Sequence, residues 1–454
     1  MIILDLHKLK NRISGRKFCW FIYLSMKIKY FLKGYLKGKL RKCFLFFIKN
    51  SSIIKMNIGI TIGLNEENES MWVNGIKLNA ILLANALQQI GKHNVYIIDT
   101  SNKVEDLTKV RWDYNKFPVK KLSDVFSTTD IMITLGTSFP SETIKRFKDQ
   151  GPNKRLIKYM CGNSYVIEME RSIFKDGNDL GIAPWDAGAD EVWYVPQQGY
   201  QNHYYYRSIF RTDKVYPVPF VWDPMFLHEE IEVYKRIGKK MPIYNVNTPQ
   251  AEKKLSVFEP NLNVVKYAMI PILAAEEVYR RGVEFNKMFI SSGKALLKNG
   301  YFKSMIKTLD MVKVIEKDPN EVKVKFTSRY PVCHYLAETS DIVVSHQWEN
   351  PLNYSYLDVM YLGFPLIHNA DMIKDAGYYY PDFNIEAAAD QIQYALEHHD
   401  NNREEYAKRN KLVLDRYTIK NTQMIDLYDK LIENLYDGQH QLSHEYDWKT
   451  NLYK

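Results

Sequence analysis

The sequence DIVVSHQWENPLNYSYLDVMYLGFPLIHN, residues 341–369, contains a strand, a helix and a second strand in succession. The apolar runs 341–345 and 366–369 are short, as is typical of strands that are buried on both faces of a parallel sheet. Between them, residues 356–362 have a helical pattern and Gly363-Phe364-Pro365 makes a turn. A helix between two buried strands predicts a βαβ unit, and therefore a parallel α/β sheet.

The same alternation extends through the C-terminal half of the chain. Residues 255–258, 287–290 and 322–326 are further predicted strands, and residues 263–281 have the pattern of a long amphipathic helix. These elements predict a Rossmann-like lobe over residues 240–425.

A second α/β series occupies the N-terminal half. The apolar run 57–63 is followed by a helical pattern over 75–91 and a strand pattern over 94–99, which together predict another βαβ unit. Later strand patterns lie at 131–135, 156–160 and 191–194. We therefore expect a second Rossmann-like lobe over residues 56–225.

The fold class predicted is α/β, with two doubly wound lobes that face a cleft. Three prolines between residues 216 and 224 interrupt regular structure, so the connection between the lobes is expected near 222–242. The last helices, over 403–435, are expected to pack back across the cleft, and residues 426–454 to form a C-terminal helix and tail.

The charge is distributed unevenly along the chain. The net charge of the 454 residues is +9, but residues 1–55 alone carry +13 and residues 56–454 carry −4. A groove for a nucleic-acid backbone needs basic residues clustered on the folded surface, so we predict no nucleic-acid partner. The four cysteines lie far apart without a CxxC pair, which argues against a disulfide framework and a zinc site.

Residues 1–55 form a basic extension in which aromatic and aliphatic residues mix with lysine and arginine. Such a segment is typical of helices that lie on an anionic membrane surface. Its apolar run is too short to span a bilayer. The alternatives are a disordered extension, or a working protein that begins at Met56. The predicted location is cytoplasmic, with membrane association through this extension as an open alternative.

Residues 357–367, LDVMYLGFPLI, resemble the LEAMAxGxPVV signature of GT-B glycosyltransferases, especially of the GT4-like families. The block from residues 258–261 to 349–354 also resembles an uncharacterised glycosyltransferase-like family named DUF2827. The resemblance implies a nucleotide-sugar donor bound by the C-terminal lobe and an acceptor bound by the N-terminal lobe. In those families an acidic residue at the place of Asp358 binds the ribose hydroxyls of the nucleotide, a role suited to a carboxylate. The earlier glutamate of the signature corresponds to Asn350, next to Glu349.

Further donor-binding candidates follow the predicted strands. A nucleotide-sugar enzyme must neutralise a diphosphate leaving group, which cations and helix N-terminal N–H groups can do. Lys266 is expected in the first helical turn after Asn261, and the alternative for it is a solvated surface lysine. For Arg329 the alternative is a surface ion pair. The predicted donor-binding residues are Asp358, Asn350, Arg329, Lys294, Gly293, Ser292, Asn261 and Lys266.

A cluster of polar residues directly after the strand 341–345 gives the catalytic candidates. His346 and Glu349 lie at a strand end just before Asp358, where a donor sugar would bind. We predict both as catalytic residues. The structural alternative is that Trp348 packs under the following helix while Glu349 caps it.

The long polar loop 64–75 of the N-terminal lobe is the predicted acceptor site, since ligands of open α/β sheets bind at the carboxyl ends of strands. The alternative is a solvated connection. A general base from this lobe is not assigned among Glu66, Glu67 and His93. The predicted acceptor-binding residues are Asn65, Trp72, Asn74 and Gly75.

The function predicted is a glycosyltransferase that moves a hexosyl or related group to a glycan or other hydroxyl acceptor. The nucleotide-sugar is a substrate, and no cofactor or metal is predicted. The resemblance favours retention of anomeric configuration, while the missing glutamate leaves inversion open. Two alternatives stay open: a nucleotide-sugar epimerase of the same fold, and a non-catalytic binding protein that docks by its basic N-terminus.

Overall fold

The computed structural model describes residues 55–67, 69, 75–110, 117–174, 188–313, 323–437 and 446–453. Residues 56–454 form one compact unit. The predicted N-terminal extension lies outside the described residues, except for Lys55. Within the described part of the chain, no helix is long and apolar enough to cross a membrane.

The N-terminal lobe is built on a seven-stranded parallel sheet in the order β3-β2-β1-β4-β5-β6-β7. The register of the central pair runs from Asn57 opposite Asn94 to Ile62 opposite Asp99. The strand order reverses between β1 and β4. The strands are β1 Asn57–Ile62, β2 Asn94–Asp99, β3 Val119–Lys121, β4 Ile131–Thr134, β5 Arg155–Met160, β6 Glu191–Tyr194 and β7 Val215–Pro217.

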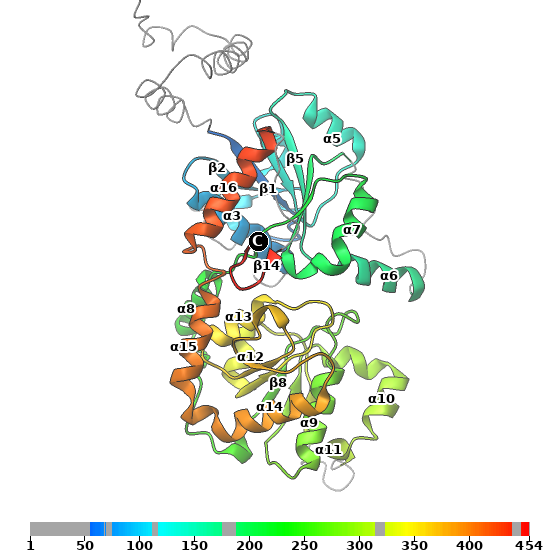
Figure 1. Ribbon diagram of the computed structural model, residues 1–454, viewed down its shortest axis with the longest axis vertical. Helices are drawn as coiled ribbons and strands as arrows, with labels where there is room; N and C mark the ends of the chain where they lie inside the picture. The colour runs from blue at the N-terminus through cyan, green and yellow to red at the C-terminus, as the bar shows by residue number, and fades with distance from the viewer. Residues whose placement is uncertain are drawn as a thin grey trace, which may run out of the picture. The chain divides into compact units, whose positions relative to one another are not determined.

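Helices connect these strands on both sides of the sheet (Figure 1). The best buried is α3, in which nearly every residue from Lys77 to Leu87 is buried, because it packs on β1 and β2 and is covered by a later helix. The helical segments are α3 Gly75–Gln89, η2 Leu107–Lys109, α4 Leu122–Val125, α5 Ser141–Lys148, α6 Ser164–Phe174, η3 Pro196–Gln198 and α7 Gly199–Phe210.

The C-terminal lobe contains a six-stranded parallel sheet in the order β10-β9-β8-β11-β12-β13, with its own reversal between β8 and β11. All but the last strand have three residues. They are β8 Leu255–Val257, β9 Met288–Ile290, β10 Val324–Phe326, β11 Ile342–Val344, β12 Leu366–His368 and β13 Tyr378–Tyr379. The two doubly wound α/β lobes predicted from the sequence are thus confirmed, while the predicted lobe boundaries stay predictions.

The helices of this lobe include one correction to the sequence analysis. The helix expected over 263–281 begins only at Met269, so Lys266 lies in a loop and not in a first helical turn. Pro271 fits the first turn of the true helix, where its missing N–H removes no hydrogen bond. The segments are η4 Gln250–Glu252, α9 Met269–Arg280, η5 Gly293–Lys298, α10 Gly300–Ile306, α11 Asp310–Lys313, α12 Val332–Glu338, α13 Tyr354–Tyr361, η7 Asp371–Ile373, α14 Ile385–His398, η8 His399–Asn401 and α15 Arg403–Leu414.

The connection between the lobes is partly helical. Helix α8, Met225–Arg236, follows directly after the proline-rich segment and packs on α12.

The end of the chain returns to the N-terminal lobe, as predicted (Figure 1). Helix α15 packs on α13, whereas the next helix, α16 Thr422–Asp437, packs on α3. The strands β14 Tyr446–Asp447 and β15 Leu452–Tyr453 pair antiparallel after it. Between them, the buried Asn451 binds the backbone of Phe220 through both its amide oxygen, at 3.0 Å, and its amide nitrogen, at 2.9 Å. The tail therefore stays attached to the interlobe connection.

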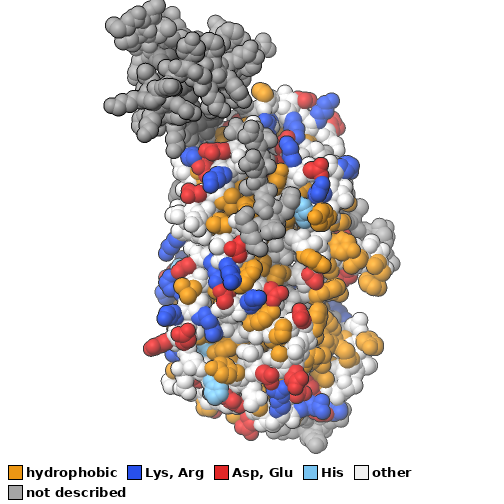
Figure 2. Space-filling model, viewed as in Figure 1, with side chains coloured by type: hydrophobic (Ala, Val, Ile, Leu, Met, Phe, Trp, Pro, Cys, Tyr) orange, Lys and Arg blue, Asp and Glu red, His pale blue; other side chains and the backbone are white. Residues whose placement is uncertain are grey.

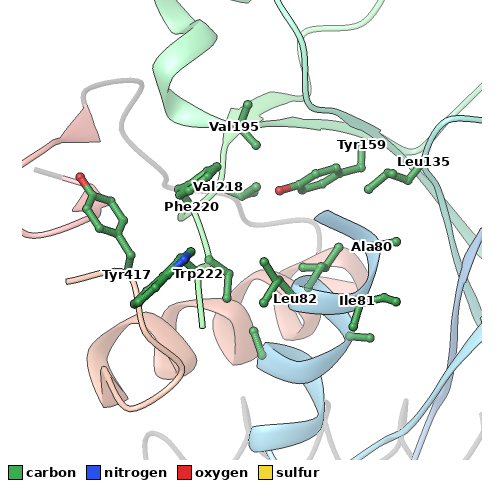
Figure 3. Packing of buried hydrophobic residues seen from close by; sticks show 14 of the residues in the cluster. Ala80, Ile81, Leu82, Leu135, Tyr159, Val195, Val218, Phe220, Trp222 and Tyr417 are labelled. Carbon is green, nitrogen blue, oxygen red and sulfur yellow. The ribbon is translucent and has the colours of Figure 1, made fainter. Parts of the chain in front are cut away.

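Two large hydrophobic cores hold the lobes. One is confined to the C-terminal lobe, around β8, β9 and α14. The other includes the N-terminal strands and α3, and continues into α13, α15 and α16. Figure 3 shows part of it, where Leu82, Trp222 and Tyr417 pack together. On the face drawn in Figure 2, Lys and Arg side chains are interspersed with Asp and Glu, in line with the small net charge of residues 56–454.

Candidate functional site

A cavity of about 500 Å³ lies between the lobes. Its walls come from α3, from the interlobe connection with α8, and from loops of the C-terminal lobe. Phe258, Ser291 and Arg329, which line it, come shortly after β8, β9 and β10. The cavity therefore lies at the carboxyl edge of the second sheet and beside its point of strand reversal, where ligands of open α/β sheets bind.

Asp358 lines this cavity from the second turn of α13. The indole nitrogen of Trp222 donates a hydrogen bond to its Oδ1 atom at 2.8 Å. Among the described residues, none donates a hydrogen bond to Oδ2. Burial raises the pKa of Asp358 to about 7, and the Glu230 charge adds to the rise, while the bond from Trp222 opposes it. The cavity thus contains a buried carboxyl group whose Oδ2 atom is available to accept a hydrogen bond from a ligand.

Two cationic side chains, Lys266 and Arg329, line the same cavity. Burial lowers the pKa of Lys266, and repulsion from Arg329 lowers it further, whereas the Glu259 carboxyl opposes this shift. Cations that repel each other across a cavity wall favour an anionic ligand, because the anion relieves their repulsion. The sequence-predicted residues that this cavity brings together are Asp358, Lys266, Arg329 and Gly75.

Glu259, to which the sequence analysis gave no role, interacts electrostatically with Lys266. It is 2% exposed. Its carboxyl accepts hydrogen bonds from the Ser345 hydroxyl and, at 3.0 Å, from the Gln347 amide. Burial raises the pKa of Glu259 to about 7, although these bonds and the Lys266 charge oppose the rise. Its position directly after β8 was the one available signal in the sequence.

The other predicted donor residues shape the loops behind the cavity. The Asn261 side chain donates to the carbonyls of Glu259 and Ser291, each at 2.9 Å, and accepts from the N–H of Ala268 at 2.9 Å. Ser292 has a left-handed backbone with φ 53°. A Cβ on Gly293 would come within 2.6 Å of the Phe326 ring. The structure places Asn261, Ser292, Gly293 and the exposed Lys294 around the cavity wall rather than in its lining.

Glu349 and Asn350 belong to a network of polar side chains between the lobes. The network reaches Glu259, because the Asn350 amide donates to Gln347, which donates to the Glu259 carboxyl. From the N-terminal lobe, Gln201 donates to the Glu349 carboxylate and Gln198 to the Asn350 amide oxygen. The Asn163 amide donates to the Glu349 carbonyl at 2.9 Å. Glu349 also has a left-handed backbone, with φ 52°. Neither residue lines the cavity.

The alternative that Glu349 caps the next helix is wrong. The N-cap of α13 is Asn353, whose side chain accepts a hydrogen bond from the N–H of Ser355.

His346, the other catalytic candidate, lies in an aromatic environment outside the cavity lining. Its Nδ1 atom is 3.0 Å from the Tyr380 hydroxyl, and its ring packs on Phe383. Its Nε2 atom is buried and has no hydrogen-bond partner among the described residues. Burial lowers the pKa of His346 to about 4, so the imidazole is neutral near pH 7.

The predicted acceptor loop is described only in part. Trp72 and Asn74 lie outside the described residues. Asn65 is exposed, and its backbone N–H and side-chain amide donate to the Glu69 carboxylate at 2.7 and 3.0 Å. Among the described residues of this loop, Gly75 lines the cavity.

The unassigned base candidates lie elsewhere. Glu67 forms an ion pair with Lys109 at 3.5 Å, and His93, just after α3, lies near Asp429 of α16. Neither lines the cavity, and neither does Glu66. In the described ranges, no cluster of three or more His, Cys, Asp or Glu side chains could hold a metal ion.

Two parallel α/β lobes with a ligand-sized cavity between them form a GT-B type of fold, which the chain shares with solved glycosyltransferase structures. A sucrose-phosphate synthase from Thermosynechococcus elongatus superposes with a TM-score of 0.52 at 11% identity, over 85% of this chain and 100% of that one. HepE from Anabaena, solved with UDP-glucose, gives a TM-score of 0.50 at 11% identity, over 84% of this chain and 100% of that one. No curated protein matches the chain. Residues 58–432 match the family described as "Protein of unknown function (DUF2827)", and the chain belongs to that family.

Proposed function

We propose that the protein is a glycosyltransferase that takes a sugar from a nucleotide-sugar donor and transfers it to a hydroxyl acceptor. One observation carries this proposal. The cavity between the lobes combines a carboxyl group, Asp358, with two cations, Lys266 and Arg329, at the ends of parallel strands. A nucleoside diphosphate presents the complementary groups, namely ribose hydroxyls and a charged diphosphate.

Each contact between the donor and the protein in the proposed complex has a chemical basis. A ribose hydroxyl donates to the Asp358 carboxylate, which is an acceptor when ionised. The diphosphate lies against Lys266 and Arg329, which stabilise the charge that develops as the glycosidic bond breaks. These two cations supply the neutralisation that a metal ion provides in other enzymes, so we propose transfer without a metal. The Glu259 charge favours the protonated form of Lys266, which is the form that binds a diphosphate.

The acceptor is proposed to enter from the N-terminal lobe, past Gly75. The network that holds Glu349 and Asn350 ties the loop after β11 to α7 and to the residues before α6. We keep Glu349 and His346 as candidates for contacts to the donor sugar. Both follow β11, as the loop that leads to Asp358 does.

Thermal unfolding of the full chain with UDP, GDP, ADP and CMP tests the proposal. A bound nucleotide at about 100 times its dissociation constant adds about 2.7 kcal/mol of stability, which raises the melting temperature. We expect one nucleotide class to give this shift in the wild type and not in Asp358→Ala. Release of the free nucleotide from its sugar conjugate in the presence of an acceptor then measures transfer. Absence of any shift would refute the proposal, and binding without turnover would identify a non-catalytic binding protein.

A further inference from the structure

A second carboxyl group, Glu230, lines the same cavity and has no role in the site described so far. It comes from α8, which belongs to the connection between the lobes and not to either Rossmann-like sheet. Its Oε1 atom is buried and has no hydrogen-bond partner among the described residues. A buried carboxylate oxygen without a donor is costly, so it is a good place to look for a ligand.

The surroundings of Glu230 locate it at the nucleoside end of the cavity. Its carboxyl interacts with the thiol of Cys333 in the first turn of α12, just after the loop that carries Arg329. Its charge also contributes to the raised pKa of Asp358. Glu230 therefore lies close to the proposed ribose site, beside the loop after β10.

The walls next to Glu230 suit a flat aromatic ring. Phe226 and Leu227 lie four and three residues before it on α8, so they share its helix face and also line the cavity. Tyr330 lines the cavity from the loop between β10 and α12, and Val332 lines it from the first position of α12. A purine or pyrimidine would contact these side chains with its faces and Glu230 with its edge.

The edge of the base decides which nucleotide fits a carboxylate. An ionised carboxylate has two oxygens that only accept hydrogen bonds. Guanine presents two adjacent donors, its ring N1–H and its exocyclic amino group. Uracil presents one N–H between two carbonyl oxygens, which a carboxylate repels, and adenine and cytosine pair a donor with an acceptor nitrogen.

We propose that Glu230 selects a guanine nucleotide as the donor, with its two oxygens accepting from the N1–H and the 2-amino group. The inference rests on the proposed function, and it names the donor class for that site. It also assigns a role to α8, because the helix would then supply base specificity to a cavity otherwise formed by the lobes.

The test measures dissociation constants of the full chain for GDP, IDP, UDP and ADP, by calorimetry or thermal shift. IDP keeps the N1–H but lacks the amino group, so we expect it to bind about tenfold more weakly than GDP, and UDP and ADP more weakly still. Glu230→Gln is isosteric and should weaken GDP by about 10- to 100-fold. The matched control Glu232→Gln changes an exposed glutamate on the same helix and should leave GDP binding unchanged.

The outcomes separate this inference from the proposed function. Equal binding of GDP and IDP by the wild type, or tighter binding of UDP or ADP that Asp358→Ala abolishes, would overturn the role of Glu230 and leave the transferase proposal intact. Binding of no nucleotide would overturn both. The comparison of GDP with IDP needs no variant, so it holds even if Glu230→Gln does not fold.

Discussion

Asp358, which is proposed to bind the ribose, lowers the stability of the free protein at neutral and higher pH. Its pKa is raised to about 7 because burial disfavours the charged form. The folded state therefore binds one proton more than the unfolded state between the ordinary pKa of an aspartate, 3.8, and about 7. Stability that depends on this proton is lost as the pH rises through that window. A ligand that donates to the carboxylate would recover part of the lost stability.

The variant Asp358→Asn should therefore be more stable than the wild type at pH 8, although it lacks the carboxylate proposed to bind the ribose. The asparagine amide keeps an oxygen for the Trp222 bond and carries no charge. We expect the gain at pH 8 to exceed the gain at pH 5 by roughly 1–3 kcal/mol. Chemical denaturation at the two pH values measures it.

The exposed Asp426→Asn is the control for this experiment, because it removes a carboxylate that is not buried. An advantage of Asp358→Asn that is equal at pH 5 and pH 8 would contradict the pKa assigned to Asp358.

At the scale of residues, the sequence predicted Asp358 because a local signature, helix then Gly363 and Pro365, fixes its spacing. Glu230 carries no such signal. It reaches the cavity only because α8 packs on α12, about a hundred residues further along the chain. Contacts between distant segments leave no periodicity in a single sequence, and the same holds for the interlobe partners of Glu349.

The loop between β8 and α9 shows how one side chain can hold an element. Asn261 has a left-handed φ of 54°, and its side chain makes three hydrogen bonds to the backbone of Glu259, Ser291 and Ala268. These bonds join the ends of β8 and β9 to the start of α9. They also fix the loop that carries Lys266, so Asn261 supports the cavity from outside its lining.

Asn261→Ala should lower the free energy of unfolding by roughly 2–4 kcal/mol, because it leaves backbone groups without partners and puts a Cβ without a polar group in the left-handed region. Asn261→Gly relieves only the backbone conformation and should recover less than half of that loss. Urea denaturation measures both variants. Leu262→Ala changes the next residue, which is 70% exposed, and serves as the control. A variant Asn261→Ala as stable as the control would show that these bonds contribute nothing net.

At the scale of elements, the sequence predicted the central strands well and the helix boundaries less well. The strands β1, β2 and β4 are mostly apolar, so their burial is visible in the sequence. β5 was predicted as well, although it contains Arg155 and Lys158. The start of α9 was set too early because residues 263–268 continue its apolar pattern, whereas the Asn261 bonds hold them in a loop. The edge strands β3, β7 and β13 were missed. Two of the three residues of β3 are lysines and β7 ends in proline, so neither shows an apolar run, and β13 has only two residues.

The C-terminal helix α16 joins the two halves of the molecule. By sequence it follows the second lobe, yet Ile432 is fully buried in the core that contains Ile58, Ile60 and Leu87 of the first. The Tyr428 hydroxyl donates to the Pro219 carbonyl at 2.6 Å, and Lys92 pairs with Asp429. The core of the N-terminal lobe therefore depends on a helix near the C-terminal end of the sequence.

Ile432→Ala should destabilise the N-terminal lobe selectively. Removing a buried isoleucine to alanine costs about 2–5 kcal/mol, because it leaves a cavity. Hydrogen exchange should show lost protection in β1 and β2, with β8 and β9 much less affected. Ile392→Ala, in α14 of the second core, is the matched variant and should give the reverse pattern. Uniform loss of protection in both variants would mean that the two cores unfold as one.

The shared core also limits how far the two lobes can separate to admit a ligand. Two lobes separate easily only when little apolar surface is buried where they meet. Here Trp222, Leu357 and Tyr417 are buried in the core that the lobes share. Separating the lobes widely would expose these side chains to water, with a free-energy cost of about 25 cal/mol for each Å² of apolar surface exposed. A small rotation of one lobe against the other costs less free energy, because it keeps these side chains buried. A ligand of the cavity should therefore enter and leave without wide separation of the two lobes.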